Sequence, residues 1–239
     1  VTLRDAGIIT LTCSEPALPT DRKNIAYRAA EKFFKATKLN CGADISLTKR
    51  IPFEAGLAGG STDAAAVLKA LNELCDTKLS TRELCAIGVK LGADVPFCIC
   101  GGTMLAQDIG QVLSELPALR DCFIVLVKPD VGVSTKEAFE AFDTAESIRH
   151  PDCTVMLHAA ANADFDGIVK NVGNVFEQFI EVPQRAEIKA IMRSHGSLAC
   201  CMSGSGPTIF GIFDTKEKAE KCAAAIPEKL GKAFVTKPI

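Results

Sequence analysis

The sequence has almost no excess charge and no long apolar segment. Its 27 basic and 29 acidic residues leave a net charge of −2, whereas general nucleic-acid binders and membrane-surface proteins carry a basic excess. No apolar run reaches the roughly 18 residues that cross a bilayer, and the N-terminus lacks the basic-then-apolar order of a signal peptide. We therefore expect a cytoplasmic protein that acts on a small molecule, with neither nucleic acid nor membrane as a partner.

Metal and redox motifs are missing as well. The three histidines, His150, His158 and His195, are not spaced as zinc ligands, and the 11 cysteines form no C-x-x-C pair. Cysteines lie inside apolar runs such as Phe97–Cys100 and Leu198–Met202. We interpret them as small core residues in a reducing compartment, and we expect no structural metal.

A glycine-rich loop followed directly by helix-forming sequence occupies residues 51–72. Gly56, Gly59 and Gly60 permit tight turns and close approach of a ligand to backbone N–H groups. The helix predicted over Ala64–Asn72 adds unpaired N–H groups with partial positive charge at its start. Together with the strand predicted over Asp44–Lys49, this order predicts a phosphate site, and a merely structural tight turn is the alternative.

The same segment excludes two better-known phosphate loops. No Gly-Lys-Ser/Thr follows at Walker spacing, and the glycines do not follow the G-x-G-x-x-G pattern of dinucleotide folds. We expect Ser61, Thr62 or Asp63 to cap the helix.

Two further segments carry candidate functional residues. Leu91–Phe97 reads LGADVPF and places one carboxylate, Asp94, in apolar, glycine-containing surroundings. A turn or helix-cap role is the alternative for Asp94. Met202–Thr208 is a second loop rich in glycine, together with serine. It is not a nucleophile elbow, because that motif needs glycine two residues before the serine, and the residue two before Ser205 is Ser203. A flexible turn is its alternative interpretation.

The pattern of elements predicts two domains. Thr20 or Asp21 is expected to cap an amphipathic helix, and Ser80 or Thr81 a later one that ends at Gly92. Composition shifts after Pro117, so we place the domains at residues 1–118 and 119–239. Alternating strands and helices in the second half predict a two-layer α/β sandwich. The first domain is expected to end in a hairpin over 103–106 and 112–116. In the second domain, Ser134 is expected to cap a helix, and further helices are expected around 166–179 and 183–194.

Taken in order, these motifs resemble those of the GHMP kinases, which are named for galactokinase, homoserine, mevalonate and phosphomevalonate kinases. The matches are Pro52–Asn72, Leu91–Phe97 with Gly101–Thr103, and Met202–Thr208, supported by Pro19–Asn24 and Val133–Thr135. The resemblance implies an α+β GHMP kinase fold of two α/β sandwich domains with the active site in the cleft between them. It also implies ATP and Mg²⁺ as cofactors. The expected reaction phosphorylates a methylerythritol hydroxyl of a cytidine diphosphate-linked small molecule, in the non-mevalonate route to isoprenoid precursors.

The resemblance also assigns roles to residues. Asp94 would accept the proton of the substrate hydroxyl or orient that hydroxyl, and Ser61 would contact the metal. Gly204 and Ser205 would approach the substrate from the second domain. Phe139 would stack on the pyrimidine base, and a place in the hydrophobic core is the alternative. The expected nucleotide contacts are Pro52, Ala55, Gly56, Leu57, Ala58, Gly59, Gly60, Ser61 and Thr62.

The beginning of the chain departs from the family pattern. A first strand with a catalytic lysine and an asparagine, followed by an Asp-Gly-Tyr-His motif, has no match here, and the residues around Arg4 do not resemble it. We therefore expect a segment before Val1. A nucleotide-binding fragment without catalysis, or another GHMP kinase acting on homoserine or mevalonate, remains an alternative, and we expect a monomer or homodimer.

Overall fold

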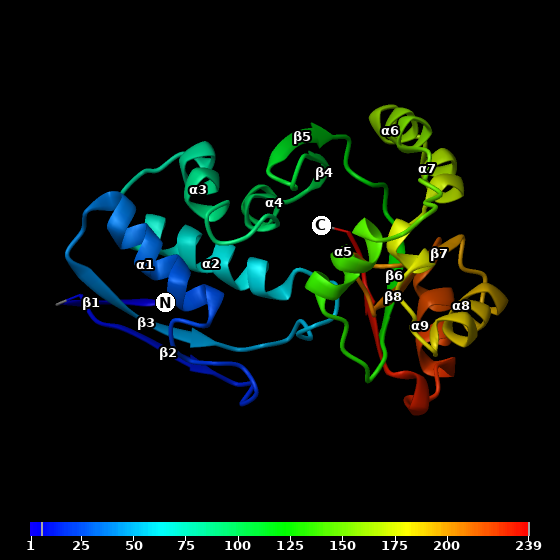
Figure 1. Cartoon of the computed structure of the whole chain (residues 1–239), viewed down its shortest axis with the longest axis horizontal. Helices are drawn as coiled ribbons and strands as arrows, with labels where there is room; N and C mark the ends of the chain where they lie inside the picture. Colours follow the sequence, from blue (N-terminus) through cyan, green and yellow to red (C-terminus); the bar gives the residue numbers. More distant parts are fainter. Residues whose placement is uncertain (6, 239) are drawn as a thin grey trace. The chain divides into compact units, whose positions relative to one another are not determined.

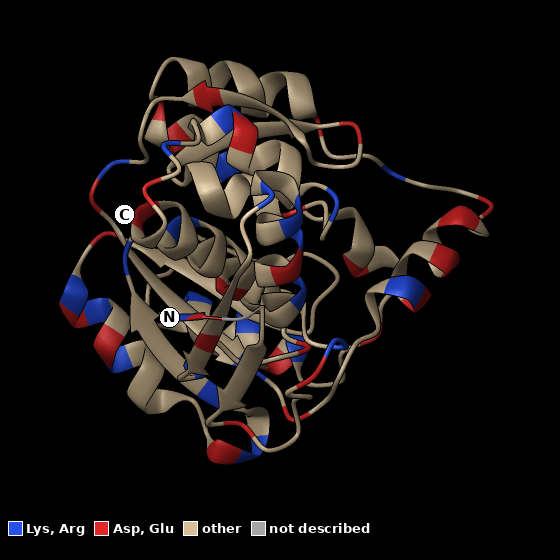
Figure 2. Ribbon diagram, turned by 90° about the vertical axis from the view of Figure 1, so that its left-hand side faces the viewer, with Lys and Arg blue, Asp and Glu red and all other residues tan. Residues whose placement is uncertain are grey.

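The computed structural model describes residues 1–5 and 7–238. They form two compact units, each described here by itself (Figure 1). Unit 1 contains Val1–Ile51 and Ala58–Glu115, and unit 2 contains Pro52–Leu57 and the chain from Leu116 onward. Basic and acidic residues are interspersed along the ribbon in Figure 2. In the described part of the chain, no helix is long and apolar enough to cross a membrane.

Unit 1 is built on a three-stranded sheet in the order β1-β3-β2. The strands are β1 (Thr2–Asp5), β2 (Ile9–Cys13) and β3 (Cys41–Leu47). The middle strand β3 pairs antiparallel with β1 and parallel with β2. Helices α1 (Ile25–Thr37) and α2 (Gly59–Leu74) lie over one face of this sheet (Figure 1). Their apolar sides, including Phe33 and Leu68, form the core of the unit.

Helix α1 begins after Asn24, so the prediction of a cap at Thr20 or Asp21 is wrong. The Ala26 N–H donates to Asn24 Oδ1 over 2.9 Å, and Asn24 Nδ2 donates to the Pro19 carbonyl over 2.8 Å. Asp21 instead accepts from the Lys23 N–H, within the turn that precedes the helix. The amide of asparagine can cap the helix and hold this turn at once, which explains why the helix starts there.

The remainder of unit 1 agrees more closely with the predictions. Ser80 and Glu83 form a capping box at α3 (Thr81–Gly88), which ends one turn before the predicted Gly92. The short helix α4 (Val95–Cys100) follows. Strands β4 (Thr103–Gln107) and β5 (Val112–Leu116) then form a two-stranded sheet, as the sequence predicted.

Unit 2 contains a four-stranded antiparallel sheet in the order β7-β8-β6-β9. Its strands are β6 (Phe123–Lys128), β7 (Ala199–Met202), β8 (Ile209–Phe213) and β9 (Lys232–Thr236). Strand β6 pairs with β8 and β9 in the interior of the sheet, and its Val125 and Val127 are fully buried in the core of the unit. Helices α8 (Arg185–Ser194) and α9 (Lys216–Ala225) pack on the sheet, so the predicted two-layer arrangement is confirmed.

The remaining helices of unit 2 correct the predictions in detail. Ser134 caps α5 (Thr135–Asp143) as expected. Helix α6 (Cys153–Ala161) was not predicted, and Asp152 begins it by accepting from two backbone N–H groups. One predicted helix from Asp166 to Phe179 is instead α7 (Phe165–Asn171) and the 3₁₀ helix η1 (Val175–Gln178). A second 3₁₀ helix is η2 (Glu228–Leu230).

The interpretation of the cysteines as core residues is correct only in part. Cys122, Cys201 and Cys222 are buried, whereas Cys100 and Cys153 are exposed. The exposed pair lies at helix ends, where an apolar neighbour in sequence does not imply burial.

Candidate active site

The loop from Pro52 to Leu57 packs against the turn at Ser203–Gly206 within unit 2. The Ser203 hydroxyl donates to the Gly56 carbonyl over 2.7 Å. Gly56 has a φ of +68°, and a Cβ there would stand 2.2 Å from the Ser203 carbonyl oxygen. The contact therefore requires glycine at this position. The glycine-rich loop before α2 and the glycine–serine loop at Met202–Thr208 therefore meet here.

Helix α2 starts at Gly59, before the residues predicted to cap it. Ala58 occupies the N-cap with a φ of 49°, and its side chain makes no capping hydrogen bond. Thr62 lies in the first turn, where its Oγ1 donates to the Ala58 carbonyl over 3.1 Å. The prediction of a cap at Ser61, Thr62 or Asp63 is wrong because the left-handed turn at Ala58 starts the helix sooner. The first N–H groups of a helix have no partner inside it, so they are available to an anion.

A lysine missed by the sequence predictions stands beside this helix start. Lys49 Nζ lies 2.5 Å from Asp63 Oδ2, and these side chains are only 5% and 16% exposed. A Cβ on Gly59 would lie 3.0 Å from Lys49 Nζ, so the ammonium group touches the first turn of α2. The available signal was the basic pair Lys49–Arg50 directly before the glycine loop.

Asp94 occupies the N-cap of α4 and is exposed, but its side chain makes no capping hydrogen bond. The alternative of a turn or helix-cap residue therefore fits the position of Asp94, although its side chain makes no capping bond. A Cβ on Gly92 would lie 3.9 Å from Ser61 Oγ. Thr62 Oγ1 lies 3.6 Å from the Sγ atom of Cys98, in α4. Unit 1 thus brings the Asp94 segment beside Ser61 and Thr62.

The C-terminal glycine–serine loop is held by side chains from other elements of unit 2. Asn174 Nδ2 donates to the carbonyls of Met202 and Gly204, over 2.8 and 2.7 Å. Ser205 is buried, and its hydroxyl lies 3.2 Å from the Thr135 hydroxyl. These contacts fix the loop at a defined position next to α5. Asn174 had not been singled out from the sequence.

Phe139 is 53% exposed on α5, so the alternative that it belongs to the core is wrong. Its ring meets Phe176 edge to face, with 5.1 Å between the ring centroids. The ring is therefore held in place while much of it faces solvent.

Comparison with known proteins identifies the family. Residues 24–102 match the GHMP kinases N terminal domain, and residues 156–232 match the GHMP kinases C terminal family. The chain belongs to the GHMP kinase family. The 4-diphosphocytidyl-2-C-methyl-D-erythritol kinase of Clostridium beijerinckii is 43% identical over 97% of this GHMP kinase and 83% of its own length. The kinase of the same name from Clostridium acetobutylicum is 42% identical over 98% of this chain and 84% of its own length.

Solved structures confirm the GHMP kinase fold. A crystal structure of 4-(cytidine 5'-diphospho)-2C-methyl-D-erythritol kinase has a TM-score of 0.78 at 31% identity, covering 99% of this chain and 84% of that one. A homoserine kinase from Cytophaga hutchinsonii has a TM-score of 0.83 at 22% identity, with the same coverage. The second likeness concerns the fold alone.

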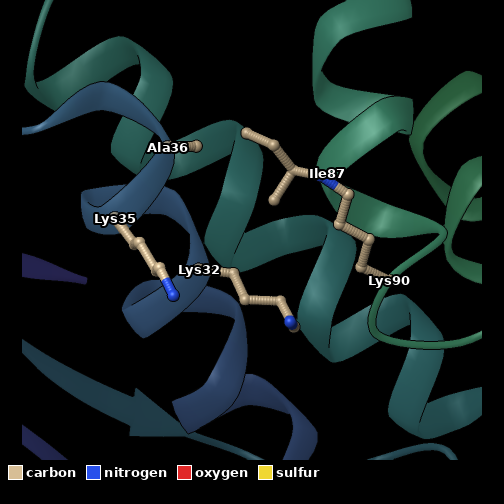
Figure 3. Close-up of a pocket in the computed structure, with 5 residues that line it drawn as sticks. All are labelled: Lys32, Lys35, Ala36, Ile87 and Lys90. Atoms are coloured by element: carbon tan, nitrogen blue, oxygen red, sulfur yellow. The ribbon is translucent and has the colours of Figure 1, made fainter.

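A hollow of about 330 Å³ lies on unit 1 of this GHMP kinase. Figure 3 shows Lys32, Lys35 and Ala36 from α1 opposite Ile87 and Lys90. None of the residues predicted to bind nucleotide or substrate is among these lining residues. Three of its lining residues are lysines, and two of them, Lys35 and Lys90, are exposed, in contrast to the enclosed Lys49–Asp63 pair.

Proposed function

We propose that this GHMP kinase phosphorylates a hydroxyl of 4-diphosphocytidyl-2-C-methyl-D-erythritol with ATP as the donor, in non-mevalonate isoprenoid precursor biosynthesis. The observation that carries this proposal is the 43% identity, over 97% of the chain, to a kinase named for that substrate. We also propose that its two domains divide after residue 118. Phosphoryl transfer depends mainly on positioning and on neutralising phosphate charge, so the roles below concern those two tasks.

We propose that the ATP phosphates bind along Pro52–Thr62 at the start of α2. The N–H groups of the first turn and the Lys49 ammonium group beside it provide positive charge there. Gly60 offers the cleaner test of this site. A Cβ on Gly59 would meet Lys49 at 3.0 Å, whereas one on Gly60 would meet only an Ile25 methyl group at 3.4 Å.

Gly60→Val should therefore place its side chain in the phosphate path without disturbing the protein. We expect ATP affinity, measured by calorimetry, to fall about tenfold or more. Ala66→Val is the matched control, because Ala66 is exposed on the same helix. If Gly60→Val binds ATP as tightly as Ala66→Val does, the phosphates do not bind here.

We propose that Mg²⁺ binds together with the ATP phosphates and is held mainly by their oxygens. The described residues contain no group of three His, Cys, Asp or Glu side chains that could hold a metal ion. Magnesium in kinases commonly keeps water and phosphate ligands and takes few from the protein. We propose the Ser61 hydroxyl as a protein ligand. The bound ion would supply charge neutralisation at the phosphates.

We propose that Asp94 orients the acceptor hydroxyl and accepts its proton. The carboxylate is exposed and makes no capping bond, so its oxygens are available to a substrate. We further propose that Gly204 and Ser205 contact the substrate from the loop fixed by Asn174.

We propose that Phe139 stacks on the cytosine ring of the substrate. Phe139→Leu tests this role, because leucine keeps an apolar contact with Phe176 but removes the aromatic face. Stacking contributes about 1–3 kcal/mol per base, so binding of cytidine diphosphate should weaken roughly 5- to 150-fold. Equal affinity of the variant and the wild type would remove Phe139 from the site.

The proposed activity is tested with the full-length gene product, ATP, Mg²⁺ and each candidate acceptor. We expect ADP release and a new phosphomonoester signal in phosphorus NMR with 4-diphosphocytidyl-2-C-methyl-D-erythritol only. Turnover of homoserine or mevalonate instead would assign the chain to another GHMP activity. ATP binding without turnover of any acceptor would contradict the proposed enzyme function.

A further inference from the structure

The thiols of Cys85 and Cys100 lie next to each other in unit 1. Cys85 belongs to α3, Cys100 is the last residue of α4, and these two helices pack together. Their Sγ atoms are 3.8 Å apart. A disulfide bond needs about 2.05 Å, so side-chain rotation or a small helix shift of roughly 2 Å would join them.

The two thiols differ in their surroundings. Cys100 is exposed, and the space beside the following Gly101 and Gly102 is open, because a Cβ on either would have no neighbour within 4 Å. Cys85 is partly buried, and burial together with the hydrogen bond to Cys100 raises its pKa to about 11. An oxidant from solvent therefore reaches Cys100 first, while Cys85 next to it remains a protonated thiol.

We propose that Cys85 and Cys100 form a site of reversible oxidation, at which a peroxide converts the two thiols to an intramolecular disulfide bond. The Cys100 thiol gives up its proton, and its sulfur attacks one peroxide oxygen, which breaks the O–O bond and gives a sulfenic acid. The other oxygen leaves as hydroxide and takes up that proton to form water. Cys85 then gives up its proton, and its sulfur attacks the Cys100 sulfur and displaces hydroxide, which takes up that proton to form water. In total the two thiols lose two electrons and two protons, and one hydrogen peroxide becomes two water molecules.

The disulfide would affect the helix that follows Asp94. It would fix the last residue of α4 to α3. Without the bond, the chain leaves α4 through Gly101 and Gly102, whose φ angles are +75° and +68°. The proposal itself concerns only the two thiols and does not depend on the proposed kinase function.

Trypsin cleavage provides a direct test, because cleavage after Arg82, Lys90 and Arg120 puts the two cysteines on different peptides, 83–90 and 91–120. The reduced protein is treated with hydrogen peroxide, blocked with iodoacetamide and digested without reductant. We expect the two peptides joined, with a mass two hydrogen atoms below their sum, and separated again by dithiothreitol.

Peptide 91–120 also carries Cys98, which lies against Thr62, so three serine variants assign the bond. The cross-link should persist in Cys98→Ser and disappear in both Cys85→Ser and Cys100→Ser. A bond between Cys98 and Cys100 that leaves peptide 83–90 free would overturn the proposal. Oxidation of Cys100 to sulfinic or sulfonic acid while Cys85 stays a thiol would overturn it as well.

Discussion

Replacing Asp63 with asparagine should destabilise unit 1 far more than a single surface change does. Asp63 Oδ2 lies 2.5 Å from Lys49 Nζ, and the lysine side chain is only 5% exposed. Asparagine preserves the shape but removes the charge, so the Lys49 ammonium group would stay enclosed without a counter-ion. The ammonium group cannot readily move out to solvent, because the first turn of α2 at Gly59 lies against Nζ.

The size of this effect follows from the burial of the pair. Removing one partner of a buried ion pair costs about 3–5 kcal/mol, because it leaves an uncompensated charge. Asp63 itself is 16% exposed, and the asparagine carbonyl can still accept from Lys49, so we expect the lower end of this range. A loss of about 3 kcal/mol corresponds to a roughly 100-fold change in an opening equilibrium.

Amide hydrogen exchange measures the change in stability of each unit separately. Amides of α2 that exchange through opening of unit 1 should exchange roughly 100-fold faster in Asp63→Asn. Amides of β6, in unit 2, should be unaffected. Asp76→Asn is the matched control in the same unit, because the Lys78–Asp76 pair is exposed and its loss should cost less than about 1 kcal/mol.

The result that would refute this reasoning is an α2 exchange rate in Asp63→Asn as mildly changed as in the control. A further check is the double variant Lys49→Met with Asp63→Leu, which removes both charges. We expect it to recover most of the lost stability, because no buried charge remains unpaired.

Two other substitutions test contacts that fix the fold around the site. Gly56→Ala should lower the stability of unit 2 by at least about 2 kcal/mol in urea unfolding, because its Cβ would meet the Ser203 carbonyl at 2.2 Å in a left-handed conformation; an unchanged midpoint would mean that this loop contact does not form. Asn24→Ala should cost about 1–2 kcal/mol, seen as faster exchange in α1, because it removes the helix cap and the bond to Pro19; unchanged exchange would show that another group caps α1.

Elements with local signals were predicted well. The start of α3 is set by Ser80 and Glu83, and the start of α5 is set by Ser134, which accepts from the Glu137 N–H. Each signal lies within four residues of sequence. The glycines at 56–60 likewise mark the approach to α2. Such signals act through hydrogen bonds between near neighbours, so a single sequence is enough to recognise them.

Features that depend on distant partners were missed. Lys49 is positioned by its ion pair with Asp63. Gly56 is held by a hydrogen bond from Ser203, 147 residues later in the chain. Strand β1 exists because it pairs with β3. No local pattern reports such pairings. The left-handed turn at Ala58 was missed for a related reason, since glycine is the residue usually expected there.

Asp94→Asn tests the central claim most directly. Asparagine keeps the volume of the side chain and removes its charge, and the native side chain makes no capping bond that could be lost. In the full-length gene product, the measurement is the turnover of 4-diphosphocytidyl-2-C-methyl-D-erythritol beside ATP affinity in the same preparation. We predict unchanged ATP affinity and a turnover reduced about 10²–10⁴-fold, the usual contribution of a positioned general base. Near-normal turnover in Asp94→Asn would contradict the account and leave Asp94 as a turn residue.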